Sequence, residues 1–366
     1  MFESVKPEVI ANQLRKARET AGLTQHDVGE RLDIPKERID YWEKGKETPS
    51  VEELWVLSDL YGRSTDYFLL ELPAMPESLS FRMKAVHILE ELPQSVKQIF
   101  IRFEELCRAE YELEKALDTT KQVRFKRDGS DDPYELASSE RYRLELGDYP
   151  IKDLRQLLVS QGIRVFILPI PEFKPVDLAG VSWWHETYGP CILINGKNVP
   201  GRRTFTMAHE YAHLLHSDPP TVCAYMVDHP QERFADSFAK DFLMPSSGVL
   251  RIFRNRGYVS ASITDQELGS IASIFGVSLE AMSIRLEELS LASEGFTNLN
   301  IERWEKKPKF YRPSRGPRWR RQLGEDFVQL AGNAYYRGFV SANRLAKYFG
   351  IDIRETLNTM REIKHK

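Results

Sequence analysis

The sequence predicts a mainly α-helical protein with one small α+β domain between an N-terminal and a C-terminal helical region. Apolar residues recur at intervals of three and four along most of the 366 residues, which is the spacing of helices that pack on a core. Three short apolar runs, at 163–168, 181–184 and 191–194, are bounded by glycine and polar residues, as strands are. A chain of this length forms about two to four domains.

The composition is that of a soluble protein of the cell interior. A hydrophobic content of 42% with a net charge of −3 is ordinary for such proteins. No apolar run approaches the roughly 18 residues of a membrane span, and the first residues lack the apolar stretch of a secretory signal. The cysteines Cys107, Cys191 and Cys223 form no C-x-x-C pair. We therefore expect a cytoplasmic protein in a reducing compartment, with no membrane partner.

The N-terminal region is expected to be a bundle of short helices. Thr24 is a plausible N-cap, Pro35 stands at a helix start, and Gly45 follows the third helix. Ile39 and Trp42 are three residues apart and should anchor the third helix in the core. The expected helices span residues 9–20, 25–32, 36–43 and 51–61.

This order of elements resembles the five-helix helix-turn-helix domain of Cro/cI-type (XRE) regulators, with a match over residues 11–70 of an expected domain 1–72. The resemblance implies that the third helix enters the major groove of an operator DNA. The residues then expected to approach bases are Gln25, Lys36, Glu37, Asp40 and Tyr41, and those expected to approach phosphates are Lys44 and Lys46.

The charge of this region argues for weak DNA binding by a single copy. Residues 1–72 hold ten Lys and Arg against fifteen Asp and Glu. Non-specific affinity depends on the number of phosphates that are neutralised, so an acidic domain gains little of it. A homodimer that joins two half-sites could recover affinity. The alternative is a protein-docking module that kept the fold.

The segment 203–216 contains the most informative motif, His209-Glu210-x-x-His213. Residues four apart lie one above the other on a helix, so both imidazoles can reach one zinc ion at about 2.0–2.1 Å. Glu210 is then placed to take a proton from a water at the open coordination position and deliver it to a leaving amine, as in metalloproteases. The alternatives are a structural zinc site and an ordinary hydrogen-bonded histidine pair.

A hydrolytic zinc site needs a third protein ligand. Glu232 opens a segment with apolar residues at helical spacing, and Asp236 lies one turn further on the same face. This pair resembles the Glu-x-x-x-Asp of thermolysin-like zincins, in which the first acid binds the metal and the second holds a ligating imidazole. A solvated helix face is the alternative. The candidates after His213 are His216, Cys223, Asp228, His229, Glu232 and Asp236.

Taken together, these residues resemble the ImmA/IrrE-type metallopeptidases over residues 136–246. The family usually has Gly at the position of Ala212 and often Asn at that of Asp236, and both changes are conservative. The resemblance implies a zincin-like peptidase domain with zinc ligands His209, His213 and Glu232, and Glu210 as general base. The motif comprises Arg203, Phe205, Thr206, Ala208, His209, Glu210 and His213, followed by Glu232, Ala235, Phe238, Ala239 and Leu243-Met244-Pro245.

Two further features of the peptidase domain stay open at the level of sequence. The strand Cys191–Asn195 is either a sheet edge that holds an extended substrate or an ordinary core strand. The side chain that steadies the oxyanion is unidentified, with His216, Tyr225 and His229 as candidates.

The remaining regions are expected to be helices and connectors. Residues 73–135 form a helical connector with a break at Pro93 and a linker at 123–133. Residues 247–366 form a C-terminal helical region, with a capping box at Thr264 and a helix start at Ser278. The segments 263–289 and 339–363 could be helix-turn-helix-like pairs. Such pairs can also serve only to pack the domain, without binding DNA. The basic and aromatic segment 303–321 suits either a solvated connector or phosphate contact with stacking.

The sequence therefore predicts a DNA-binding transcriptional regulator with its own zinc endopeptidase, which cleaves a repressor or another partner protein. The alternative is a repressor or antitoxin in which the zinc domain is a sensor or an interaction module without turnover. Glu210 favours the enzyme, because a structural zinc site does not need it.

Overall fold

The computed structural model describes nine stretches of the chain, and these fall into two compact units. One unit contains residues 1–108 and 170–173, and the other contains 109–169 and 174–366. The described stretches are residues 7–63, 65–69, 93–127, 130–172, 178–216, 222–224, 230–260, 263–306 and 317–364.

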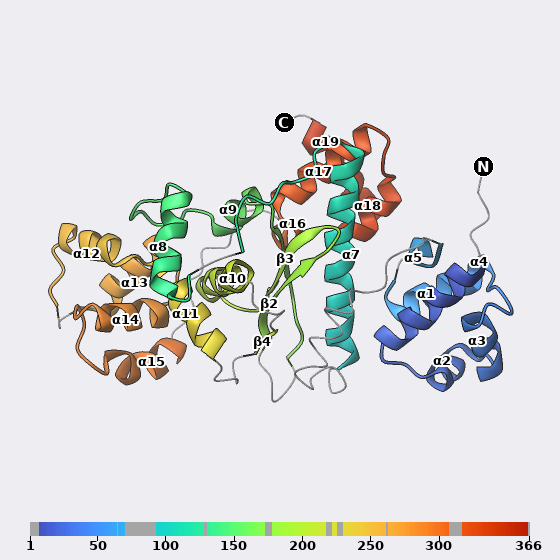
Figure 1. The fold of residues 1–366 in the computed structure, drawn as a ribbon, viewed down its shortest axis with the longest axis horizontal. Helices are drawn as coiled ribbons and strands as arrows, with labels where there is room; N and C mark the ends of the chain where they lie inside the picture. The colour runs from blue at the N-terminus through green and yellow to red at the C-terminus, as the bar shows by residue number, and fades with distance from the viewer. Residues whose placement is uncertain are drawn as a thin grey trace. The chain divides into compact units, whose positions relative to one another are not determined.

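The first unit contains the four short helices expected from apolar spacing and a fifth, α5, as the resemblance to five-helix domains implies (Figure 1). The Thr24 hydroxyl accepts a hydrogen bond from the Asp27 amide, which caps the start of α2, and Asp33 ends that helix in the left-handed conformation. Ile39 and Trp42 are each 1% exposed, so the third helix is anchored as expected. The bounds are α1 Pro7–Thr20, α2 Gln25–Leu32, α3 Lys36–Glu43, α4 Val51–Tyr61 and α5 Thr65–Leu69.

Helix α7 (Gln94–Ala116) begins directly after Pro93, as predicted, while the helix expected before Pro93 falls outside the described residues. Two shorter helices, α8 (Pro133–Arg143) and α9 (Leu154–Ser160), lead into the sheet. The apolar spacing of residues 151–158 predicts a helix from Ile151. Helix α9 starts three residues later, because Asp153 caps it by accepting a hydrogen bond from the Gln156 amide.

The sheet has four strands in the order β1-β3-β2-β4. β3 pairs in parallel with β1 and antiparallel with β2, and β4 pairs antiparallel with β2. The proposal that Cys191–Asn195 is a sheet edge is therefore wrong, and the alternative of a core strand is correct. β4 was not expected from the sequence. The bounds are β1 Arg164–Leu168, β2 Leu178–His185, β3 Gly189–Asn195 and β4 Val222–Ala224.

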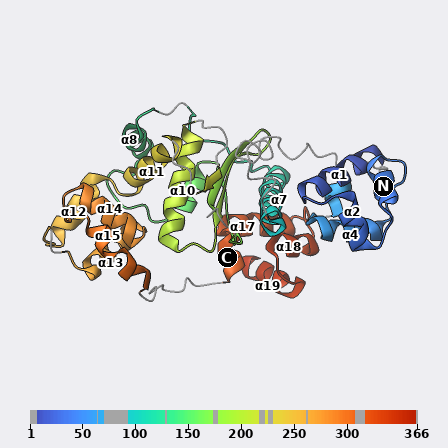
Figure 2. The ribbon, with the colours of Figure 1, turned by 90° about the horizontal axis from the view of Figure 1, so that it is seen from below.

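Helices cover both faces of this sheet (Figure 1 and Figure 2). Val165 and Ile167 of β1 share a core with α10 (Pro200–Leu215) and α11 (Pro230–Leu243). Phe166, which points the other way on the same strand, packs edge to face on Phe327 of α17 (Glu325–Tyr336), with ring centroids 5.5 Å apart.

The core around α10 continues through four more helices. Its buried residues run from Phe125 to Trp304, and they include Phe253, Leu268 and Met282. The predicted capping box at Thr264 and the predicted helix start at Ser278 are both present. These helices are α12 (Ser246–Asn255), α13 (Asp265–Phe275), α14 (Leu279–Glu288) and α15 (Phe296–Lys306).

The last described residues form α16 (Arg318–Leu323), α17, α18 (Ala342–Phe349) and α19 (Ile353–Lys364). Two aromatic residues of the basic segment 303–321 are used for packing. Trp304 is buried in the core, and Trp319 stacks on Phe349 at 5.0 Å. Residues 307–316 lie outside the described residues.

The protein is thus mainly α-helical with a small α+β part, as the sequence predicts. Within the described residues, only the pair α13 and α14, which is bent by 100°, has the length and apolar character of a membrane span, and no single helix has them.

Candidate metal centre and helix-turn-helix surface

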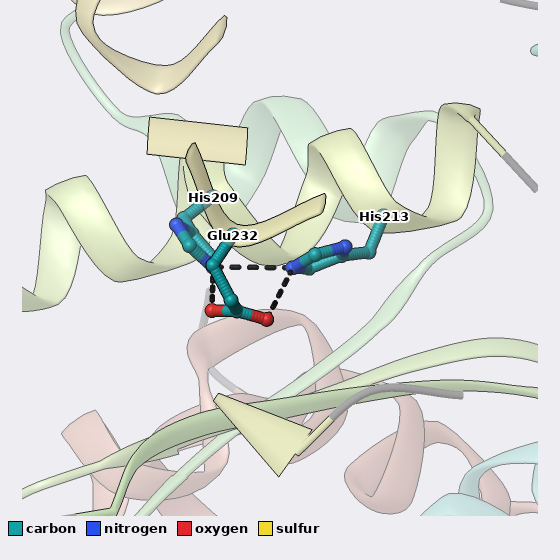
Figure 3. Close-up of side chains that lie close together, drawn as sticks. All are labelled: His209, His213 and Glu232. Carbon is teal, nitrogen blue, oxygen red and sulfur yellow. Dashed lines mark hydrogen bonds and ion pairs between the residues drawn. The ribbon is translucent and has the colours of Figure 1, made fainter. Parts of the chain in front are cut away.

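Three side chains that the sequence singles out converge at the junction of α10 and α11. His209 and His213 lie one turn apart on α10, and their Nε2 atoms are 3.1 Å apart. The Glu232 carboxylate of α11 lies 3.2 Å from Nε2 of His209 and 3.5 Å from Nε2 of His213. Figure 3 shows the two rings and the carboxylate pointing toward one another.

These three residues fit a zinc ion in both donor type and spacing. Two ligand atoms at 2.0–2.1 Å from a tetrahedral centre are about 3.3 Å apart, and the three separations here scatter around that value. Among the described residues, His209, His213 and Glu232 form a group that could hold a metal ion. Two imidazoles and one carboxylate leave a fourth position open, as in hydrolytic zinc sites.

Asp236 contacts His209 at the ring nitrogen that does not face the other two residues. Its Oδ1 lies 2.8 Å from Nδ1 of His209, although the aspartate side chain is 61% exposed. Burial alone would lower the pKa of His209, but the hydrogen bonds to Asp236 and Glu232 outweigh it and raise the pKa to about 10. The bond to Nδ1 fixes the ring orientation and leaves Nε2 directed at the centre of the group.

Glu210 lies on the same helix but under the sheet. Its side chain is fully buried, and its charge contributes to the raised pKa of His209. Strand β2 passes directly over it at Gly180, where a Cβ atom would lie 2.7 Å from Oε1 of Glu210 and 2.6 Å from Cγ2 of Thr206. The pairing of β2 with β4 shifts register between Leu178 and Gly180. A glycine and an irregularity at this place let the strand approach the carboxylate.

Gly180 is a residue that sequence reasoning missed. The signal available was a glycine just before the apolar run 181–184, which is typical of a close backbone approach. Its contact with Glu210 was not predictable from the sequence, because the packing of α10 against β2 depends on the tertiary fold.

A second set of contacts fixes α10 from the side opposite the metal group. The buried Tyr211 hydroxyl donates to the carboxylate of Glu140 on α8, and Arg143 donates to the same carboxylate at 2.8 Å. Burial and the Glu140 charge raise the pKa of Tyr211, so the phenol stays protonated and remains a donor. Helix α8 therefore keeps the histidines of α10 in register with α11.

The other metal and oxyanion candidates are placed only in part. His216 has Nε2 3.3 Å from Oδ1 of Asp131 and packs against Phe234, with ring centroids 4.5 Å apart. Tyr225, Asp228, His229 and the side chain of Cys223 fall outside the described residues.

The predicted DNA-contact residues of the first unit lie on and beside α3. Gln25 is half-buried and donates to Glu43 at 2.9 Å, and Glu43 is in turn bound by Arg18 at 2.6 Å. Asp40 is half-buried and accepts from Lys44 at 2.7 Å. The exposed members of the set are Lys36, Glu37, Tyr41, Lys44 and Lys46, with Lys46 over the ring of Tyr41 at 5.3 Å.

Two regions of the chain match models of known protein families. Residues 159–287 match the family model of the IrrE N-terminal-like domain, and residues 14–68 match a helix-turn-helix model. The chain is also similar to the HTH-type transcriptional regulator ImmR of Bacillus subtilis (strain 168), at 37% identity over 60 residues. That match covers 16% of the chain and 47% of the relative, so the chain spans about half of the relative's length. The chain therefore joins an XRE-type helix-turn-helix region to an IrrE-like domain of the peptidase type, as the sequence predicts.

Proposed function

We propose that the IrrE-like domain is a zinc-dependent endopeptidase that cleaves a repressor or another partner protein and thereby controls gene expression. The observation that carries this proposal is the convergence of His209, His213 and Glu232 at separations of 3.1 to 3.5 Å. These are the ligand separations of a tetrahedral zinc site with an open position.

The residues around this group have distinct roles in the proposed reaction. Zinc held by the three ligands supplies Lewis acidity, which activates water and polarises a peptide carbonyl. Asp236 keeps the His209 ring oriented. Glu210 takes the proton of the attacking water and passes it to the leaving nitrogen, so its position under β2 matters for catalysis and not for metal binding.

The test compares metal content and cleavage in the intact chain and two variants. Glu210→Gln should bind zinc like the unmodified chain and lose cleavage of a helix-turn-helix repressor encoded beside it, because only the proton carrier is removed. His213→Ala should lose both zinc and cleavage, because a ligand is removed. Full cleavage by Glu210→Gln would overturn the proposal. Stoichiometric zinc in the intact chain without any cleavage would favour a regulator without turnover.

We further propose that the helix-turn-helix region reads an operator through Gln25 at the start of α2 and Lys36, Glu37, Asp40 and Tyr41 of α3, with Lys44 and Lys46 on phosphates. The side chains of this surface that are exposed carry both signs of charge. A homodimer on two half-sites would compensate for the weak electrostatic attraction of one copy. Sedimentation with and without operator DNA tests this part of the proposal, and a 1:1 complex on a single half-site would contradict it.

A further inference from the structure

Helices α18 and α19 repeat the helix-turn-helix arrangement of α2 and α3. The first helix of each pair has eight residues and begins at a hydroxyl cap, Thr24 or Ser341. Each first helix ends in a left-handed residue, Asp33 or Gly350, that starts a three-residue turn. A short turn of this kind between two helices is the signature of a helix-turn-helix.

The two pairs also agree in burial when they are counted from the turn. The first helices carry a small residue three positions before their last residue, Gly29 in α2 and Ala346 in α18. The second helices bury the same three positions. These are Ile39, Trp42 and Glu43 in α3, and Thr356, Thr359 and Met360 in α19. Helix α17 packs against α19 as α1 packs against α3, which completes a three-helix unit (Figure 1 and Figure 2).

A third pair, α13 and α14, has the same turn but a different surface. Its turn residues Val277 and Ser278 are packed so closely on Gly201 of α10 that a Cβ atom on that glycine would lie 2.5 Å from their backbone. The solvent-exposed residues of α14 include Glu280 and Glu288. Glu288 is itself paired with Lys240 at 2.7 Å, and no basic residue of α14 is exposed. This pair is therefore a packing unit whose second helix offers no basic side chain to phosphates.

The outer face of α19 has the opposite character. Arg354, Asn358 and Arg361 follow one another at intervals of four and three residues, so they share one face, and all three are exposed. Ile353 precedes them and is 39% exposed. Asn358 and Arg361 contact each other at 3.4 Å, and no ion pair to an acid is found for the two arginines among the described residues.

The acids of α19, Glu355 and Glu362, lie on the flank beside this face and are bound by residues of α16. The Trp319 indole donates to Glu355 at 2.8 Å, and Arg320 donates to Glu362 at 3.2 Å. Residues 317–364 hold nine Lys and Arg against five Asp and Glu, whereas residues 7–69 hold nine against thirteen. The C-terminal helical unit, residues 317–364, is thus basic, whereas the N-terminal unit, residues 7–69, is acidic.

We infer that α19 is the recognition helix of a second duplex-DNA-binding surface. Arginine forms paired hydrogen bonds with guanine and asparagine with adenine in the major groove, and an exposed isoleucine can contact a thymine methyl group. Arg354 and Asn358 lie in the first turns of α19, which is the part of such a helix that reaches the bases. Arg361 and Lys364, further along, neutralise phosphates.

The test measures binding of the full chain to a duplex of about 20 base pairs, two helical turns, by fluorescence anisotropy at several salt concentrations. All proteins carry Lys36→Ala, Tyr41→Ala and Lys44→Ala, which weaken the N-terminal surface. On this background Arg354→Ala with Arg361→Ala should lower affinity at least about tenfold and reduce the salt slope by about 0.9, because Arg361 is the phosphate contact of the two and about 0.9 is lost per phosphate contact. Circular dichroism verifies that the fold is retained.

The matched control is Arg254→Ala with Arg337→Ala, which removes the same charge from exposed positions on α12 and after α17. This control should leave affinity and slope unchanged. Arg354→Lys with Arg361→Lys should keep the slope but lose sequence preference. Equal losses in the test and control variants, absence of binding by the background chain, or tighter binding of single-stranded RNA than of duplex DNA would each overturn the inference.

Discussion

The metal group and the surface of α3 are both built on helices, but they differ in how their side chains are held. His209 and His213 are enclosed between α10, α11 and the sheet, and each contacts Glu232. The predicted DNA-contact residues on and beside α3 are exposed or half-buried, and their polar contacts are mostly with one another, such as Lys44 with Asp40. The fixed positions of these three side chains indicate what kind of ligand they can bind, whereas an exposed helix face could bind partners of several kinds.

The largest effect is expected for a variant that unfolds the first unit and leaves the metal group intact. Trp42→Ala removes a fully buried side chain from the core of the first unit, which should cost about 3–5 kcal/mol in free energy of unfolding. Because this core is separate from the one around α10, operator binding through α3 should be lost while zinc content stays unchanged. Calorimetry measures the loss of stability, and metal analysis measures the zinc content. Trp55→Ala, at a position that is 63% exposed, is the control, and loss of zinc in Trp42→Ala would contradict the separation.

Gly180→Ala tests how closely the enclosed region is packed. The added methyl group would displace the Glu210 carboxylate, and a shift of about 1 Å in a catalytic group lowers the rate of cleavage about 100-fold. Zinc content should be unchanged, because the three atoms nearest to that methyl position belong to Thr206, Glu210 and Leu193 and not to a ligand. In the control Gly269→Ala, the nearest atom would be 3.7 Å away and the rate should be preserved. An unchanged rate in Gly180→Ala would show that the carboxylate need not stay where it is.

Asp236→Ala examines the exposed residue that orients His209 of the metal group. Loss of the hydrogen bond to His209 should weaken zinc binding about 10- to 100-fold, because the ring loses its fixed orientation. Competition with a chelator measures the affinity. Glu280→Ala removes an exposed acid from α14 and should have no effect. The role assigned to Asp236 is refuted by equal zinc affinities in the two variants.

The smallest effect is expected on the surface of α3. Lys44→Ala with Lys46→Ala should reduce the salt slope of operator binding by about 1.8, with a modest loss of affinity. The loss is modest because Lys44 already neutralises Asp40 and not only phosphate. Anisotropy titrations over a range of salt concentrations measure the slope, with Arg254→Ala and Arg337→Ala as the control pair. Equal slopes in both pairs would remove these lysines from the interface.

Much of the fold was predictable because local signals decide it. Thr24, Thr264 and Ser278 cap helices where the sequence places helix starts, since a hydroxyl that accepts from a nearby amide acts within one turn. The convergence of His209 with Glu232 followed from helical spacing and from the resemblance to a known motif, and their roles as ligands stay a prediction.

The errors concern contacts between distant parts of the chain. The position of Cys191–Asn195 in the sheet depends on which strands pair with it. A continuous apolar run such as Ile192-Leu193-Ile194, all of it buried, is typical of a strand covered on both faces, and this signal favoured the core strand. β4 has only three residues and gave no alternation to detect.

Gly201 ties the start of the histidine-bearing helix to a turn almost eighty residues further along the chain. A fragment that stops after Pro245 would leave the first residues of α10 without the backbone of Val277 and Ser278 against which they rest. It would also expose Phe242 and Leu243, whose neighbours include the helices that follow. A truncated protein for crystallisation or assay should therefore extend at least to Trp304, and shorter products should aggregate when expressed.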